Sequence, residues 1–159
     1  MSDDSCDYNL AISEPLFRLT AESLRLRTNE TNRYQTLGDL VDDRATFARN
    51  IDHRVETLRD HLEIVPSTGD INISLKITRS SEENLGHAQA VLAERLGRDL
   101  TLVDALSVLV FDYMVERKSN DVLTKLLAQT SSAWEALGQP CDPPSAGNVV
   151  PFSQTSGGR

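Results

Sequence analysis

Aromatic residues, cysteine and long apolar runs are all scarce in this sequence of 159 residues. Because only 5% of the residues are aromatic, the hydrophobic core should consist mainly of Leu, Val and Ile. No apolar run approaches the ~20 residues that span a membrane. The acidic, polar start of the chain also lacks the basic and apolar stretches of a secretion signal. We therefore expect a cytoplasmic protein that does not enter a membrane.

Metal-ligand spacing and catalytic motifs are absent as well. The two cysteines, Cys6 and Cys141, lie near opposite ends of the chain. They either form a disulfide or, as we expect in cytosol, remain reduced. His53 and His61 would share one face of a helix, where we expect solvated residues rather than ligands. There is no Gly-rich phosphate loop and no nucleophile with a nearby base, and Asp42–Asp43 is typical of a solvated helix face. The sequence predicts neither an enzyme nor a metal or cofactor site.

Basic residues are fewer than acidic ones. The sequence has 16 Lys and Arg and 24 Asp and Glu, which gives a net charge of −8. The acidity is spread out: residues 1–65 hold 13 acidic and 8 basic residues, and residues 66–159 hold 11 and 8. Proteins that bind nucleic acid present basic surfaces to it. Any DNA-binding surface must therefore be local here, and the overall acidity favours a protein partner.

Residues 71–78 have the alternation of a half-buried strand, after a loop-forming stretch at 66–69. The apolar side chains of this strand share one face, made of Ile71, Ile73, Leu75 and Ile77. The polar side chains share the other face, made of Asn72, Ser74, Lys76 and Thr78. A strand with a single apolar face is not stable alone, so we expect it to pair with a second strand.

Two amphipathic helices are predicted to follow this strand. The first begins near Ser80, which forms a capping-box pattern with Glu83, and ends at Gly97, a residue suited to a left-handed C-cap. The second begins at Thr101, with Asp104 three residues later. Its apolar stripe is the widest in the chain and should lie at the centre of the core, with Leu106, Leu109 and Val110.

The C-terminal part is divided by composition. We expect Ser119 or Asn120 to interrupt the second helix, and residues 119–137 to form an additional amphipathic helix. Residues 138–159 are rich in Pro, Gly and Ser and predict a disordered tail. The one apolar patch of this tail, at 149–152, is either a docking motif or ordinary tail.

The first part of the chain repeats the strand-helix-helix plan at an offset of 65 residues. This offset places Leu10 on Leu75, Ile12 on Ile77, Asn32 on Gly97 and Thr36 on Thr101. Asn is second only to Gly in the left-handed conformation, so both turns can end a helix in the same way. The alternative is chance similarity between two helical segments. A true repeat would make residues 1–65 and 66–118 two units, with residues near 8–13 paired antiparallel to residues near 72–78.

A strand, a helix, a glycine turn and a second helix within Ile71–Lys118 resemble the ribbon-helix-helix family. The clearest local piece is Leu96–Thr101, which looks like the turn that opens the family's second helix, with Asp99 where the family often has Ser or Thr. The resemblance covers about a third of the chain, and about as much again if residues 7–54 are a copy. It implies a mainly α fold with a short two-stranded antiparallel ribbon. Helices would cover one side of the ribbon, and its polar side would enter the DNA major groove.

The resemblance also implies which residues touch DNA. Base edges would meet the polar strand residues Asn72, Ser74, Lys76 and Thr78, and in the first copy Asn9, Ala11 and Ser13. Phosphates would be held by the amides where the second helix of each copy begins, near Thr101 and near Thr36. Arg98 and Arg79 would add positive charge in the second copy, and Arg33 in the first. The alternative is that these residues are only the solvated face of the ribbon.

Two functions remain open from the sequence. The first is sequence-specific binding of double-stranded DNA, as a transcriptional regulator or as a plasmid-transfer or partition accessory factor. The resemblance suggests the transfer role because tandem single-chain members of the family occur among DNA-transfer proteins. Such a chain would be a monomeric pseudo-dimer, whereas a single true copy would require a homodimer. The second is an acidic interaction module, antitoxin-like or partner-binding. In that case the ribbon serves only assembly, and the acidic helices or the helix at 119–137 bind a protein.

Overall fold

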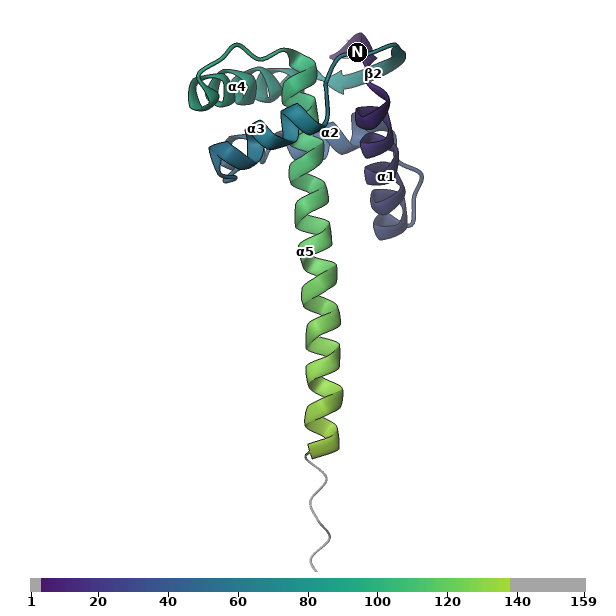
Figure 1. Ribbon diagram of the computed structural model, residues 1–159. Helices are drawn as coiled ribbons and strands as arrows, with labels where there is room; N and C mark the ends of the chain where they lie inside the picture. The colour runs from purple at the N-terminus through teal and green to yellow at the C-terminus, as the bar shows by residue number, and fades with distance from the viewer. Residues whose placement is uncertain (1–3, 138–159) are drawn as a thin grey trace, which may run out of the picture. The chain divides into compact units, whose positions relative to one another are not determined.

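The protein is mainly helical and contains one two-stranded antiparallel sheet (Figure 1). The computed structural model describes residues 4–137, and the tail predicted at 138–159, with Cys141, lies outside them. In chain order the elements are β1 (Ser5–Ile12), α1 (Glu14–Thr31), α2 (Leu37–Ala45), the 3-10 helix η1 (Ala48–Asn50), α3 (Val55–Ile64), β2 (Ile71–Thr78), α4 (Arg79–Leu96) and α5 (Leu102–Leu137). No helix among the described residues has an apolar stretch long enough to cross a bilayer. The expected fold class, helices with a short antiparallel ribbon, is confirmed at this level.

The sheet is a ribbon of two strands that lie far apart in the sequence. β1 and β2 pair antiparallel, with Leu10 opposite Ile73 and Asn9 opposite Ser74. This confirms the predicted pairing of residues near 8–13 with residues near 72–78, although β1 begins at Ser5 and ends at Ile12. The alternation of apolar and polar residues turns one face of the ribbon to the core, where four side chains are buried: Leu10, Ile12, Leu75 and Ile77.

The order strand, helix, helix occurs twice with matching boundaries. α1 and α4 each have 18 residues, and they begin at residues 14 and 79, an offset of 65. They end in left-handed C-caps at Asn32, with φ 53°, and Gly97, with φ 66°. The helices that follow begin with the same kind of capping box, at Thr36 and at Thr101. Shared backbone conformations at a single offset favour a repeat over chance similarity.

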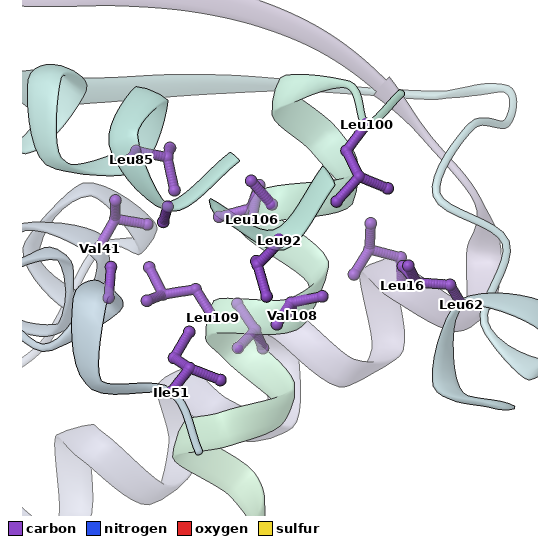
Figure 2. Close-up of a cluster of buried hydrophobic side chains, with 14 of the residues drawn as sticks. Leu16, Val41, Ile51, Leu62, Leu85, Leu92, Leu100, Leu106, Val108 and Leu109 are labelled. Atoms are coloured by element: carbon purple, nitrogen blue, oxygen red, sulfur yellow. The ribbon is translucent and has the colours of Figure 1, made fainter. Parts of the chain in front are cut away.

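The core is aliphatic, as the scarcity of aromatic residues predicted. Leu106, Leu109 and Val110 of α5 are 0%, 2% and 1% exposed, which confirms their predicted place in the core. Figure 2 shows Leu106 and Leu109 of α5 in a cluster of aliphatic side chains from other parts of the chain, among them Leu16, Val41, Leu85 and Leu92. The two-stranded ribbon therefore rests on helices from both halves of the chain.

At the 65-residue offset, the sequence of α1 matches that of α4 poorly, and the packing explains why. Thr20 and Ser23 of α1 are buried, and their hydroxyls donate to the carbonyls of Phe17 and Leu19 within the same helix. The 65-residue offset places them on Leu85 and Ala88 of α4. Each hydroxyl is satisfied locally, so a polar residue costs little at these positions. α1 therefore has the same length as α4, although it lacks the regular apolar pattern of α4.

Several helices differ from the sequence prediction. α4 begins at Arg79 with Thr78 as its N-cap, so the start predicted near Ser80, with a capping box to Glu83, is wrong. α5 runs without a break through Ser119 and Asn120, where an interruption was expected, so residues 119–137 are not a separate helix. Neither Ser nor Asn removes a backbone hydrogen bond, and each costs only a few tenths of a kcal/mol relative to a good helix former. The chain does divide into two compact units at this point, Met1–Ser119 and Asn120–Arg159. At the 65-residue offset, η1 and α3 fall on parts of α5 rather than on helices of their own, and both contact α4.

Candidate nucleic-acid interface

The polar face of the ribbon is exposed and is built from three cross-strand pairs. Asn9 lies opposite Ser74, Ala11 opposite Asn72, and Asp7 opposite Lys76, and all six residues are exposed. The residues predicted to meet base edges in the strands, Asn9, Asn72, Ser74 and Lys76, are therefore brought together on one surface. Sequence reasoning missed Asp7, although continuing the two-residue period back from Asn9 would have found it.

Ser13 does not belong to this face, so the prediction for it is wrong. The strand ends at Ile12, and Ser13 is the N-cap of α1, where it is only 7% exposed. Its hydroxyl oxygen accepts from the amide of Leu16 at 3.2 Å, and the hydroxyl donates to the carbonyl of Pro66. A capping side chain turns back onto its own helix, which withdraws it from the surface of the ribbon.

Thr78 is exposed but already has partners at the end of β2. It is the N-cap of α4, and its hydroxyl oxygen accepts from the amide of Ser81 at 3.3 Å. Its own amide and hydroxyl both donate to Oδ1 of Asp42 in α2, at 3.0 and 3.1 Å. A base edge would have to compete with Asp42 for this residue. Asp42, which the sequence assigned to a solvated helix face, therefore ties α2 to the ribbon.

The start of α2 lies against the backbone of β2. A Cβ on Gly38 would be 2.0 Å from the carbonyl oxygen of Lys76, so glycine is the residue that permits this approach. The capping box uses two amides of the first turn: that of Thr36 donates to Asp39 at 2.8 Å, and that of Asp39 donates to the Thr36 hydroxyl at 3.1 Å. A phosphate at this helix end would be bound by the amides between them.

A hollow of about 450 Å³ lies at the surface where the start of α2 meets β2. Lys76, Ser74 and Thr78 line it from the strand, and Asp39 and Asp42 line it from the helix. Two carboxylates beside one lysine make this part of the surface less attractive to a phosphate than the sequence of the strand alone suggested.

The start of α5 is arranged differently, because the chain segment before β2 lies beside it. The Thr101 amide donates to Asp104 at 2.9 Å, which repeats the capping box of α2. Asp104 also accepts from the hydroxyl of Ser67. The amide of Gly69 donates to the carbonyl of Ala11 at 3.4 Å, and a Cβ on Gly69 would clash with the backbone of Ser13. The N-termini of α2 and α5, which the 65-residue offset aligns, therefore have different surroundings next to the ribbon.

The three predicted phosphate-binding arginines are all exposed. Arg33 and Arg98 directly follow the two left-handed C-caps, so they are carried by matching turns. Arg79 is the first residue of α4, and its guanidinium lies 3.7 Å from Asp4 in a pair that is about two-thirds exposed on both sides. Exposed ion pairs of this kind are weak, so Arg79 keeps most of its positive potential for a ligand.

On the opposite face of the ribbon, Cys6 and Tyr8 of β1 both donate to Glu82 of α4. The hydrogen bond to Glu82 raises the pKa of Tyr8 to about 12. The bonds from Cys6 and Tyr8 lower the pKa of Glu82, since they stabilise its carboxylate. This arrangement fixes the first strand of one half to the first helix of the other and orients the exposed face.

His53 and His61 are not the solvated helix residues that the sequence predicted. His61 in α3 is 6% exposed, stacks on Phe111 at 4.2 Å between ring centroids and lies 2.9 Å from the Ser107 hydroxyl. Burial lowers the pKa of His61. His53 precedes α3 and contacts Asp112 at 2.8 Å. The sequence did not predict that α3 packs against α5, so it did not predict the contacts of His53 and His61 with α5. In the described part of the chain, no group of three or more His, Cys, Asp or Glu is arranged to hold a metal ion.

Comparisons with family models, curated proteins and solved structures gave no match for this chain. Any assignment of function therefore rests on the residues and geometry of the chain itself.

Proposed function

We propose that this chain is a tandem ribbon-helix-helix protein that binds double-stranded DNA with the exposed face of its ribbon. The observation that carries the proposal is the ribbon itself. Its buried face is apolar, and its other face presents Asn9, Asn72, Ser74 and Lys76 to solvent. A two-stranded antiparallel ribbon has the width of the DNA major groove. Because both strands come from one chain, the protein would need no second copy to complete the ribbon.

The polar residues of the ribbon match the chemistry of base edges. Asn9 and Asn72 can each donate to and accept from adenine, and Lys76 can donate to guanine. Ala11 can contact only the methyl group of thymine, so the first strand would read fewer positions than the second. Phosphates would be bound by the first amides of α2 and α5 and by Arg33, Arg79 and Arg98.

The charge around the ribbon predicts weak binding with a shallow dependence on salt. Asp7 faces Lys76 across the ribbon, and Asp39 and Asp42 border the same surface. Few cations are left to neutralise phosphates, so specificity would depend on base contacts more than on charge. That behaviour suits a transcriptional regulator or a plasmid-transfer or partition accessory factor, which must choose a site rather than coat DNA.

The same carboxylates favour a second candidate function. Asp7, Asp39 and Asp42 lie on the side of the ribbon that would face a ligand, and the chain carries a net charge of −8. A basic protein partner would be attracted to such a surface by long-range electrostatics. In this alternative the ribbon does not read DNA, and the protein is an interaction module whose acidic surface binds a protein partner.

Selection from a randomised library of double-stranded DNA, followed by titration at two salt concentrations, separates the candidates. We expect the full chain to enrich a defined sequence and to bind it more tightly than a scrambled control. Affinity should fall as salt rises, with a logarithmic slope of about −0.9 for each phosphate contact. Failure to enrich any sequence, together with salt-sensitive binding to a lysine-rich peptide, would favour the interaction module instead.

A further inference from the structure

The outer part of α5 exposes a row of large aliphatic side chains. Residues 120–132 are all exposed. Four of them form what we call the α5 stripe, with exposed fractions of 55%, 56%, 52% and 67% for Val122, Leu123, Leu126 and Leu127. Single exposed leucines are ordinary on protein surfaces, but a contiguous group of this kind marks an interaction site.

The α5 stripe occupies one side of the helix. At 3.6 residues per turn, its four residues fall within about 140° of the helix circumference. The opposite side carries small and polar residues such as Ala128 and Ser132. This separation is the amphipathic pattern of a helix that packs against another element. The stripe lies wholly in the second compact unit, and the ribbon belongs to the first.

The sequence of this segment does not favour an isolated helix. It is rich in Ser and Thr, which are weak helix formers, at Thr124, Thr130, Ser131 and Ser132. Helices of this length are marginal in water unless an apolar face is packed. A partner that covers the stripe would therefore stabilise the helix itself.

Charge indicates which partner fits. Residues 120–132 contain one acid, Asp121, and one base, Lys125, so this segment is neutral while the chain as a whole carries −8. A strongly basic or acidic partner would find no opposite charge here. A second copy of the same segment would meet an aliphatic stripe like its own and no repulsion. Two-fold interfaces require such a self-complementary patch.

We propose that the α5 stripe is a self-association surface, covered in solution by the stripe of a second copy of this chain. Stable interfaces bury about 1,200–2,000 Å² in total, and four side chains from each copy are few against that area. The dimer should therefore dissociate on dilution. It would carry two ribbons, which would increase the avidity for paired sites if the ribbon binds DNA. The proposal does not depend on that function, because it concerns a different surface.

Sedimentation of the full chain across a roughly hundredfold range of concentration tests this proposal. The parent should change from monomer to dimer as concentration rises. The stripe variant Leu123→Glu with Leu126→Glu should remain monomeric, with its dissociation constant raised at least roughly tenfold. The control variant Ala128→Glu with Ser132→Glu adds the same two charges on the opposite side of the helix and should dimerise like the parent.

Thermal unfolding of all three proteins at low concentration checks that the first compact unit stays folded. The transition should be the same in each, because none of the four substituted residues lies in that unit. The proposal is overturned if the parent is monomeric at every concentration or if the stripe variant still dimerises. It is also overturned if the control variant loses dimerisation to the same extent, because added charge rather than the stripe would then explain the loss.

Discussion

Asp7 and Lys76 lie directly opposite each other across the ribbon, both on its solvent-exposed face. Opposite charges at such a cross-strand position favour the pairing of the two strands. They also reduce the positive potential at the centre of the surface that we propose for DNA. Ribbon stability and DNA affinity are therefore opposed at this one pair.

Replacing Asp7 with Asn should increase DNA affinity roughly fivefold at low salt, since one repulsive charge close to a phosphate is removed. The gain should shrink at high salt, where exposed charges are screened. Asp60→Asn removes an equal charge from an exposed position on α3, away from the ribbon, and serves as the control. Titration with DNA at two salt concentrations measures the affinity of both variants. An equal gain in the two variants would mean that only net charge matters.

Leu106→Ala should lower the free energy of unfolding by about 2–5 kcal/mol, because it removes buried methyl groups at the centre of the core. Val91→Ala, at a position 41% exposed on α4, should change stability by less than about 0.5 kcal/mol. Urea unfolding of parent and variants provides the comparison. Similar losses at the two positions would contradict the placement of the core.

His61 should make the protein less stable in mild acid. Burial lowers its pKa in the folded state, so folding disfavours the protonated ring. The contribution of the neutral ring is fully present above its unfolded pKa of about 6.5, and it is lost as pH falls below that value. His61→Gln should therefore flatten the fall in the urea midpoint between about pH 7.5 and 5.5. His87→Gln, at an exposed position, should leave the pH dependence of the parent intact.

Arg44 should contribute strongly to stability because its side chain is only 10% exposed and its guanidinium pairs with Asp112 at 2.8 Å and Glu116 at 2.7 Å. Arg44→Leu should cost about 3 kcal/mol by leaving Asp112 without its main partner. Adding Asp112→Leu should recover part of the lost stability, because it removes the carboxylate that Arg44→Leu leaves without its partner. Arg25→Ala breaks an exposed pair with Glu22 and should cost less than about 1 kcal/mol. A double variant less stable than Arg44→Leu would refute this explanation.

Local backbone signals in the sequence predicted much of the fold. Asn32 and Gly97 both end helices in the left-handed conformation, and Thr36 and Thr101 both begin them, as the 65-residue offset implied. The period of two in residues 71–78 predicted which side chains are exposed. These signals are local, since each depends only on a few neighbouring residues.

The remaining features depend on packing between segments that are distant in sequence. Ser13 fits the alternation of the strand, but its role was decided by the helix that it caps. The burial of His61 depends on Phe111 and Ser107 of α5, which no local pattern connects to it. Asp42 became part of the candidate site only because α2 meets the end of β2.

Comparison of Lys76→Ala with Lys125→Ala in DNA titration tests the proposed function most directly. Lys76 is exposed at the centre of the ribbon face, and Lys125 is exposed on α5 in the other compact unit. If the ribbon reads DNA, Lys76→Ala should weaken binding to the selected sequence by about 1–3 kcal/mol. The thermal melt should fall only slightly, because an exposed cross-strand pair such as Asp7–Lys76 contributes about 0.2–1 kcal/mol to stability. Lys125→Ala should bind like the parent. Equal affinity of the parent and Lys76→Ala for the selected DNA would contradict the account.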